Sequence, residues 1–287
     1  MSSRAESRGE GRGRTVESTV VVLDGATRRS KSDRVVTEEP LEMRLVTRNA
    51  RRTLAITMRT PGNDFELVAG FCYGEGIVRA RDEIAGIHYC LDDDIGADQR
   101  YNVVNVELAR AGLPDLSQFE RHFLTSSACG VCGRAQLDEL HERGIRAVES
   151  DLHVAPELLY SLPERMRAAQ RLFESTGGLH AAALFDARGE PLAVREDVGR
   201  HNAVDKLIGW ALIENCLPLS RCILMVSGRA SYEILQKSLV AEIPIVASVS
   251  APSSLAVALA REFNVTLASF VRHKRANLYA GEARIGS

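Results

Sequence analysis

The alternation of short apolar runs with helical stretches near the end of the chain constrains the fold more than any other feature of the sequence. Segments 223–226, 243–249 and 265–271 are compact runs of mostly aliphatic residues that predict buried strands. The stretches between them, 232–240 and 252–263, have the apolar spacing of helices. Because strand–helix–strand crossovers are right-handed, we expect three parallel strands in an α/β sheet with both faces covered.

Ligands of such sheets bind at the carboxyl ends of the strands, so the three segments that follow the strands are candidate binding loops. Residues 227–231 and 250–254 open predicted helices with serine hydroxyl groups, and helix N-termini attract phosphate. Residues 270–275 concentrate positive charge at the same edge. This convergence favours a nucleotide-like or pyrophosphate-bearing ligand. Candidate binding residues in these loops are Ser227, Gly228, Arg229, Phe270, Val271, Arg272, His273, Lys274 and Arg275.

The 287 residues divide into three parts. Residues 1–33 are expected to form a largely disordered tail, because residues 1–17 have almost no apolar side chains to bury, and a short strand is predicted at 19–23. Residues 34–120 carry signals for two strands, a helix and two strands, which suggest a small α+β roll. Residues 121–287 form the α/β domain, with a C-x-x-C loop at its start. The other predicted elements are strands 41–47 and 53–59, helix 65–74, strands 84–90 and 101–109, helices 131–143 and 156–174, the hairpin of 181–185 with 190–195, and helix 202–214.

The overall composition is that of a soluble globular protein, with 45% hydrophobic and 26% charged residues. Lys plus Arg number 36 and Asp plus Glu number 38, so the net charge of −2 offers no bulk attraction to nucleic acid or anionic membranes. No apolar run approaches the ~20 residues that span a bilayer, and the N-terminus lacks the pattern of a secretory signal. We expect a cytoplasmic protein that binds neither nucleic acid nor membrane.

The sharpest local motif is the pair Cys129 and Cys132, spaced C-x-x-C immediately before a predicted helix. Free backbone N–H groups and the helix dipole favour a thiolate in this position and lower the cysteine pKa. Gly130 and Gly133 leave the backbone open to a bulky partner. The motif therefore predicts a reactive sulfur rather than a packed one.

Three interpretations of this pair stay open. A structural zinc site needs four ligands, and the chain has no second C-x-x-C or paired histidines. A thioredoxin-like dithiol normally follows a strand, whereas a long polar loop precedes this pair. The third interpretation is a nucleophilic Cys129 that carries sulfur as a persulfide, transferable by thiolate exchange. The remaining cysteines are expected to pack as small apolar residues, and they are Cys72, Cys90, Cys216 and Cys222.

Zinc-dependent deaminases also combine C-x-x-C with an α/β sheet, but their signature is His-x-Glu followed by Pro-Cys-x-x-Cys. In this chain Ala128 stands at the proline position, and no His-x-Glu precedes it. Both the zinc ligand set and the general acid are missing. Deaminase chemistry is therefore excluded, and no permanent metal is expected.

Charged and small residues are dense at 176–180 and 195–206, around a junction between strand and helix. In one interpretation Asp197 caps the helix and Arg195 is its solvated partner. In the other, the cluster is the floor of a polar pocket for a large, hydrogen-bond-rich anion, with His180 and His201 as candidate ligand contacts.

From about Glu39 to its C-terminus the chain resembles the formate dehydrogenase accessory sulfurtransferases, the FdhD family. The resemblance rests on several long motifs that occur in the same order as in the family, and such a match does not arise by chance. The motifs are AITMRTPG at 55–62, CGVCG at 129–133, TGGLH at 176–180, REDVGRHNAVDK at 195–206, SGR at 227–229 and SAPSS at 250–254.

The resemblance implies a sulfurtransferase that moves sulfur from a cysteine desulfurase to the molybdenum cofactor. The cofactor is the bis-molybdopterin guanine dinucleotide form, received before it enters formate dehydrogenase. The resemblance also implies a persulfide on Cys129, an auxiliary Cys132 and cofactor contacts in segment 270–275. For the second domain it implies a cytidine-deaminase-like fold.

Two other functions remain compatible with the sequence. A binding module that escorts the cofactor without covalent sulfur chemistry would need the carboxyl edge of the sheet but neither cysteine. A structural role would make the C-x-x-C pair half of a zinc clip that a homodimer completes. A homodimer is thus a possible partner state, beside the desulfurase and the dehydrogenase.

Overall fold

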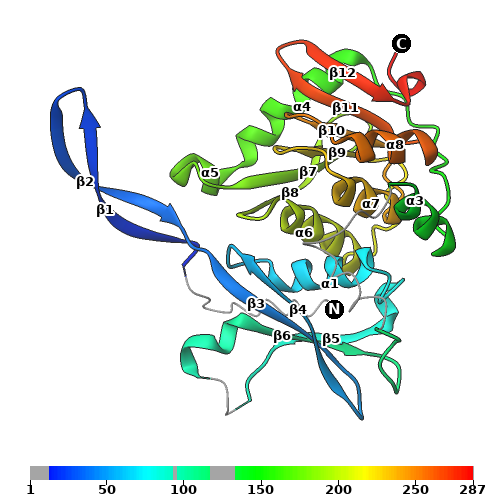
Figure 1. The fold of residues 1–287 in the computed structure, drawn as a ribbon, viewed down its shortest axis with the longest axis horizontal. Helices are drawn as coiled ribbons and strands as arrows, with labels where there is room; N and C mark the ends of the chain where they lie inside the picture. Colours follow the sequence, from blue (N-terminus) through cyan, green and yellow to red (C-terminus); the bar gives the residue numbers. More distant parts are fainter. Residues whose placement is uncertain (1–12, 93–95, 117–132, 287) are drawn as a thin grey trace, which may run out of the picture.

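The computed structural model describes residues 13–92, 96–116 and 133–286. Figure 1 shows a six-stranded and a four-stranded sheet with helices between them, and a separate two-stranded hairpin. The strands are β1 (Thr15–Asp24), β2 (Thr27–Val36), β3 (Glu39–Val46), β4 (Arg51–Arg59), β5 (Ile84–Tyr89), β6 (Val103–Leu108), β7 (His180–Phe185), β8 (Pro191–Asp197), β9 (Ile223–Val226), β10 (Ile245–Ser248), β11 (Thr266–Arg272) and β12 (Arg275–Ala280). The α-helices are α1 (Asp64–Gly74), α3 (Gly133–Glu142), α4 (Pro156–Ala169), α5 (Arg171–Thr176), α6 (Arg200–Ile213), α7 (Tyr232–Val240) and α8 (Ser254–Glu262). Short 3₁₀ helices are Arg81–Glu83, Ala97–Asn102 and Glu282–Arg284.

The larger domain is built on a six-stranded sheet in the order β12-β11-β10-β9-β7-β8. Strands β9, β10 and β11 are parallel, as the sequence predicts, while β7 and β12 run antiparallel to their neighbours. The sequence also predicts β9 and α7 with the bounds that the structure has. The mixed α/β class is therefore confirmed.

Helices cover both faces of this sheet. On one face α6, α7 and α8 contribute fully buried residues such as Leu207, Leu235 and Leu259 to one core with the strands. On the other face α4 packs Leu162 and Met166 against the sheet. Because every strand of the β9–β11 unit is covered on both sides, its residues read as unbroken apolar runs rather than as an alternation.

The smaller domain is a four-stranded sheet in the order β4-β3-β6-β5, with α1 lying on it. Helix α1 lies between this sheet and α6 of the larger domain (Figure 1). The two helices approach closely where Gly70 of α1 meets Gly209 of α6, because a Cβ on either glycine would overlap a backbone carbonyl of the other helix. The predicted two strands, helix and two strands are all present.

The N-terminal segment departs in part from the prediction. Residues 13–33 were expected within a largely disordered tail with one short strand at 19–23. That strand is confirmed within β1, but β1 is longer and pairs with β2 in an antiparallel hairpin, from Thr15 opposite Val36 to Asp24 opposite Thr27. A two-residue turn joins the strands, and Gly25 takes the positive φ of 57° that such turns need. At the base, the Thr37 amide donates to the Arg14 carbonyl. The sequence does not predict β2, because that strand is almost entirely polar.

The predicted helix 156–174 is divided at Gln170 into α4 and α5. The helix is divided by a side chain from a later part of the sequence. The carboxylate of Glu196 on β8 accepts hydrogen bonds from the amides of Leu172 (3.0 Å) and Phe173 (2.8 Å), and so caps α5 as a separate helix. In the described part of the chain, no helix combines the length and the apolar character that crossing a membrane requires.

Candidate functional site

The loops that follow β9, β10 and β11 lie side by side at the carboxyl edge of the sheet, as predicted. The Ala230 amide donates to the Ala251 carbonyl (3.2 Å), and the Ser253 amide donates to the Ala230 carbonyl (2.9 Å). The Phe270 amide donates to the Ser250 carbonyl (3.3 Å). Backbone hydrogen bonds thus join the three loops into one surface.

Two histidines from a different part of the sequence reach the same edge. His180 begins β7, and its ring packs on Gly228, where an added Cβ would lie 3.4 Å from Nδ1. His201, in the first turn of α6, has Nε2 at 3.2 Å from the Ser231 hydroxyl and 3.7 Å from a Glu233 carboxylate oxygen. The structure therefore brings His180 and His201 to the loop at 227–231, from motifs that precede it in the chain.

Arg200, the first residue of α6, was not predicted from the sequence as a site residue. An added Cβ on Gly228 would lie 3.6 Å from its Cδ, so this side chain adjoins the same surface. Within the described residues its Nε is buried and has no hydrogen-bond partner. A buried guanidinium N–H without an acceptor suits an anionic ligand. The sequence feature that could have indicated Arg200 is its position between Gly199 and His201, at the start of α6.

The two imidazoles are held neutral. Burial, with nearby Arg200 as the next cause, lowers the pKa of His201 to about 4. The same two causes lower the pKa of His180. At neutral pH the guanidinium of Arg200 therefore lies beside two uncharged rings, each able to donate one hydrogen bond and accept another. A bound anion would raise the pKa of both histidines, because its negative charge favours the protonated ring.

Several serines that were expected to face phosphate have internal partners. Ser227 Oγ accepts from the Ala181 amide (2.9 Å), which ties the ends of β7 and β9 together. Ser253 Oγ accepts from the Ala256 amide (3.2 Å) and caps α8. The backbone of these loops and the His201–Ser231 pair are further polar groups of the edge, beside Arg200 and His180.

Segment 270–275 is a tight connection rather than a loop. Phe270 to Arg272 end β11, Arg275 begins β12, and Phe270, His273 and Lys274 all have positive φ. Val271 is fully buried in the core on the α4 face, whereas Arg272 to Arg275 are exposed. Cofactor contact by this segment stays a prediction, and the exposed residues are the ones placed to make it.

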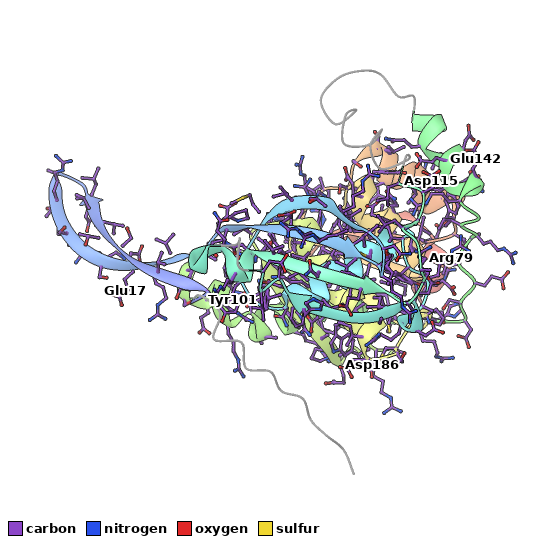
Figure 2. The ribbon with its side chains drawn as sticks, turned by 90° about the horizontal axis from the view of Figure 1, so that it is seen from below. Glu17, Arg79, Tyr101, Asp115, Glu142 and Asp186 are labelled. Atoms are coloured by element: carbon purple, nitrogen blue, oxygen red, sulfur yellow. The ribbon has the colours of Figure 1, made fainter. Side chains whose placement is uncertain are left out.

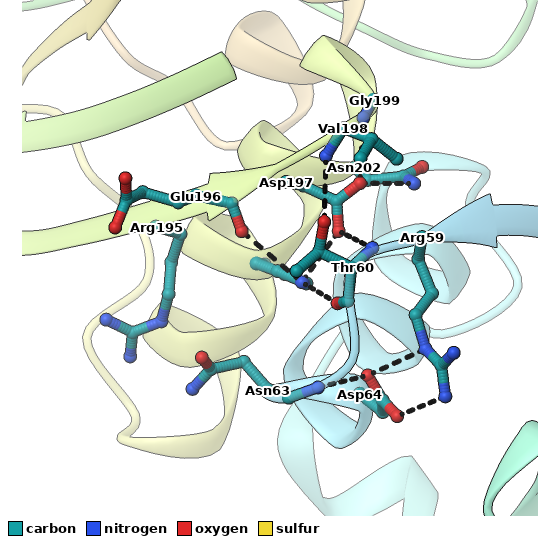
Figure 3. Close-up of polar contacts among 12 residues, drawn as sticks. Arg59, Thr60, Asn63, Asp64, Arg195, Glu196, Asp197, Val198, Gly199 and Asn202 are labelled. Carbon is teal, nitrogen blue, oxygen red and sulfur yellow. Dashed lines mark hydrogen bonds and ion pairs between the residues drawn. The ribbon is translucent and has the colours of Figure 1, made fainter. Parts of the chain in front are cut away.

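The dense motif at 195–206 serves mainly to join the two domains (Figure 3). Asp197 is fully buried, with Oδ2 2.7 Å from Lys206 Nζ and 3.2 Å from the Thr60 amide that donates to it. Asn202 Nδ2 donates to the Met58 carbonyl (2.8 Å). For these residues, the predicted pocket floor is wrong, because partners from the smaller domain fill the space.

The predicted solvated pairing of Arg195 with Asp197 is also wrong. Arg195 Nη2 donates instead to Glu66 of α1 (2.7 Å), again across the domain boundary. Asp197 does accept from the Gly199 amide (2.8 Å) just before α6, so it contributes to the start of that helix. Within this motif, Arg200 and His201 lie at the carboxyl edge.

Cys129 and Cys132 lie outside the described residues. Helix α3, which follows them directly in the chain, is confirmed from Gly133 onward. Its first turns lie beside α7, since the Tyr232 hydroxyl donates to the Gln136 carbonyl (3.4 Å). Tyr232 adjoins Ser231 of the carboxyl edge in sequence, so the helix that follows the C-x-x-C motif begins close to that edge.

The other four cysteines only partly fit their predicted packing role. Cys72 and Cys90 are buried, Cys222 is half-buried, and Cys216 is exposed, which contradicts the prediction for that residue. Burial raises the pKa of Cys72 to about 12, so it is an unreactive thiol. Among the described residues there is no group of three or more His, Cys, Asp or Glu that could hold a metal ion.

A cavity of about 880 Å³ lies elsewhere, between the end of α1, α3 and the end of α7. Figure 2 labels Arg79, Asp115 and Glu142, which line it, on the side of the molecule away from the N-terminal hairpin. Glu75 and Arg143 also line it, and none of the predicted ligand-binding residues does. The carboxyl edge is an open surface rather than part of this cavity.

Comparison with known proteins supports the family resemblance that the sequence motifs indicate. The sequence model of the FdhD/NarQ family matches residues 36–286. The chain belongs to this family. The FdhD/NarQ match begins at the last residue of β2, so nearly all of the N-terminal hairpin lies before it.

Individual FdhD proteins align along most of the chain. A protein of Streptomyces avermitilis named Sulfur carrier protein FdhD is 51% identical over 278 residues, which cover 95% of this chain and 96% of that protein. Proteins of the same name from Mycobacterium tuberculosis and Sulfurisphaera tokodaii are 45% and 44% identical, covering 89% and 93% of this chain and 93% and 97% of theirs.

One solved structure shares the fold. It is a crystal structure from Desulfotalea psychrophila, described as that of a formate dehydrogenase accessory protein. It superposes with a TM-score of 0.73 at 24% identity, covering 96% of this chain and 100% of that one. The FdhD architecture of both domains is therefore the architecture found here.

Proposed function

We propose that this protein is a sulfur carrier that accepts sulfane sulfur from a cysteine desulfurase and delivers it to the molybdenum cofactor destined for formate dehydrogenase. The observation that carries the proposal is the 51% identity, over 95% of the chain, to a protein named as a sulfur carrier. The accessory-protein description of the solved structure supports formate dehydrogenase as the recipient. The cargo is the bis-molybdopterin guanine dinucleotide form of the cofactor.

Cys129 is the proposed sulfur-carrying residue. Its thiolate attacks the terminal sulfur of the donor's persulfide, a new S–S bond forms on Cys129, and the donor cysteine leaves as a thiolate. Because one S–S bond breaks as another forms, this step needs no oxidant or reductant. Cys132 is assigned an auxiliary role. Helix α3 follows the pair directly, and a helix N-terminus favours a thiolate.

The carboxyl edge is the proposed binding surface for the guanine nucleotide ends of the cargo. Arg200 supplies a guanidinium with an unpaired buried Nε, and His180 and His201 flank it as neutral hydrogen-bonding groups. Exposed Arg229 and the exposed residues of segment 270–275 add positive charge at the same edge. Charge-assisted hydrogen bonds of this kind bind diphosphates well.

The position of α3 supports transfer between the two parts of the proposed site. The Tyr232–Gln136 hydrogen bond keeps the start of α3 beside the first turn of α7, next to Ser231 and the carboxyl edge. A carrier residue and its acceptor must come within reach of each other for transfer to occur. A C-x-x-C motif that leads into α3 suits that requirement.

The remaining parts of the proposal rest on the family resemblance. The larger domain is expected to share the fold of cytidine deaminases, with their metal chemistry absent, since a fold can persist without its original function. The protein is expected to act in the cytoplasm, to contact a cysteine desulfurase and formate dehydrogenase, and to have no permanent metal. A homodimer is a further possibility.

Mass spectrometry after incubation with a cysteine desulfurase and cysteine tests the proposal. The expected result is the added mass of one sulfur atom on the peptide that contains Cys129, lost in Cys129→Ala and retained in Cys132→Ala. Cys216→Ala is the matched control, because Cys216 is an exposed thiol outside the motif.

Dehydrogenase activation assayed with the same variants separates the competing functions. Full activation by Cys129→Ala would overturn the sulfur-carrier proposal and favour a module that escorts the cofactor. Stoichiometric zinc, lost together with the fold in Cys132→Ala, would favour a zinc clip instead.

A further inference from the structure

The carboxyl ends of three helices meet at the cavity of about 880 Å³ that lies away from the carboxyl edge of the sheet. Its lining includes Tyr73 and Glu75 at the end of α1, Glu142 and Arg143 at the end of α3, and Val240 at the end of α7. The carboxyl end of a helix carries a partial negative charge of about half an elementary charge. Three such ends around one cavity therefore attract a cation.

The basic side chains near these helix ends leave most of that negative charge unmatched. Helix α1 has no basic residue in its last turn. Lys237 of α7 is buried and paired with Asp205 (2.7 Å), and His141 of α3 lies 3.1 Å from Glu262, and none of these four lines the cavity. Arg143 Nη2 does donate to the carbonyl of the last residue of α1 (3.2 Å). That contact shows that a guanidinium fits at these helix ends.

Carboxylates outnumber guanidinium groups in the described lining of the cavity. The acids are Glu75, Asp115, Glu139 and Glu142, and the bases are Arg79 and Arg143. Three of these charged residues are labelled in Figure 2, on the side of the molecule away from the β1–β2 hairpin. The uncharged lining is mostly apolar and includes Ile77, Val78, Ile145 and Val240. Lysine and arginine side chains suit this combination, because their aliphatic stems pack on apolar groups while their charged ends face carboxylates.

The size and the donor set of the cavity favour an organic cation over a metal ion. In the part of the chain that the structure describes, no three or more His, Cys, Asp or Glu are grouped so that they could hold a metal. The volume of about 880 Å³ has room for more than one side chain. A segment of another protein with several basic side chains therefore fits the cavity.

The cavity also borders the part of the chain that carries the proposed sulfur-carrying residue. Pro114 and Asp115 line it and precede that part, whereas α3 lines it and follows the C-x-x-C motif directly. Helix α3 has ten residues and is therefore about 15 Å long. A standard interface covers about 800 Å² of each partner, which extends farther than this length. A protein docked at the end of α3 thus reaches the start of that helix, where the motif ends.

We propose that this cavity docks a segment of the cysteine desulfurase that contains lysine and arginine. The proposal rests on the sulfur-carrier function and adds the surface through which the sulfur donor binds. The carboxyl edge of the sheet, with Arg200, Arg229 and segment 270–275, has the opposite charge. Charge complementarity thus directs a cationic donor segment to the cavity and an anionic cargo to the edge.

Binding of the full chain to a purified cysteine desulfurase, measured by biolayer interferometry, tests the docking cavity. Glu142→Lys replaces an acid of the lining with a base, and Arg79→Glu does the reverse. Both residues are exposed, and lysine suits the carboxyl end of a helix, so the variants keep the fold, which a thermal melt verifies. Glu164→Lys is the matched control, because Glu164 is an exposed residue of α4, which packs on the opposite face of the large sheet from α7.

Glu142→Lys is expected to weaken binding at least roughly tenfold and Arg79→Glu to strengthen it roughly threefold, while Glu164→Lys leaves it unchanged. Hydrogen exchange provides a second measurement, in which the amides of 75–79 and 142–145 gain protection when the desulfurase is added. Equal binding by Glu142→Lys, Arg79→Glu and the unaltered chain overturns the proposal. Protection confined to other parts of the chain overturns it equally.

Sulfur loading of Cys129, followed by mass spectrometry, distinguishes a failure of the cavity from a failure of the sulfur-carrier function. Glu142→Lys should load more slowly than the unaltered chain at low desulfurase concentration and equally fast at saturating concentration, because only binding is weakened. Loading of the unaltered chain together with unchanged binding by Glu142→Lys overturns the docking cavity alone. An unaltered chain that gains no sulfur overturns the sulfur-carrier function, and this proposal with it.

Discussion

Lys206 Nζ lies 2.7 Å from Asp197 Oδ2, and both side chains are buried where the two domains meet. The same two groups also bind one residue of the smaller domain. The Thr60 amide donates to Asp197, and Lys206 donates to the Thr60 carbonyl (3.0 Å). Since Arg200 and His201 lie between Asp197 and Lys206 in sequence, this ion pair fixes the part of the chain that positions them at the carboxyl edge.

Replacing Asp197 by Asn is expected to lower the free energy of unfolding by about 3–5 kcal/mol, because it leaves the Lys206 ammonium buried without a counter-charge. Urea denaturation measures the loss. The control is Asp151→Asn, whose ion pair with Arg221 is exposed, with 76% and 69% of the two side chains accessible. Exposed pairs contribute less than about 1 kcal/mol. Equal effects of the two substitutions would show that the buried pair does not hold the domains together.

The α1–α6 contact gives a second stability prediction. An added Cβ on Gly70 would overlap the Asp205 carbonyl oxygen, which is backbone and cannot rotate away. Gly70→Ala is therefore expected to cost more than about 3 kcal/mol, even though alanine favours a helix by up to about 1 kcal/mol.

Gly112→Ala is the control for that substitution, because nothing lies within 4 Å of its added Cβ and its φ is not positive. Its effect should stay within about 0.5 kcal/mol. Thermal and urea unfolding of both variants make the comparison. A Gly70→Ala protein as stable as the control would mean that the helices separate at little cost.

The parts of the fold that were predicted from the sequence are those whose signal is local. β9 and α7 have apolar spacing that depends only on their own residues, and the two hairpin strands around Asp186 flank a polar turn. The convergence of the three loops also follows from local signals, because parallel strands with short loops bring their carboxyl ends together.

The parts that were missed depend on partners far apart in the chain. Glu196 caps α5 from β8, and Thr60 and Glu66 occupy the polar groups of Asp197 and Arg195 from the smaller domain. A single sequence shows these charges but not which of them meet. The sequence does not distinguish Arg200 from the other charged residues of its motif, because its unpaired Nε depends on where its neighbours lie in the fold.

Arg200 provides a binding prediction. If its guanidinium contacts a diphosphate, Arg200→Gln should weaken binding of GDP, used as a fragment of the proposed cargo, by roughly ten- to hundredfold. Calorimetry measures this affinity, which should also fall as salt is added. Arg188→Gln is the control, since Arg188 is an exposed arginine on the β7–β8 turn at the other end of the sheet. GDP binding that is absent in the unaltered protein, or equal in both variants, would contradict an anion site at Arg200.

His201 gives that binding a pH dependence. Its pKa is lowered to about 4, first by burial and then by Arg200, and Lys237 and His180 add smaller effects in the same direction while Glu233 opposes them. A phosphate beside the ring would raise this pKa, so the complex takes up a proton that the free protein does not hold at neutral pH. Affinity should therefore rise as pH falls from 7 toward 5, by up to roughly tenfold.

The comparison that isolates this effect uses His201→Gln, which keeps a hydrogen-bonding side chain but cannot titrate. Acid also protonates the terminal phosphate of GDP, with a pKa of about 6, and this reduces the ligand's charge in both proteins alike. The ratio of the two proteins' affinities, measured by calorimetry at several pH values, cancels the ligand's own titration. That ratio should move in favour of the unaltered protein as pH falls. A ratio that stays constant from pH 7 to 5 would mean that the imidazole of His201 does not gain its proton from the bound anion.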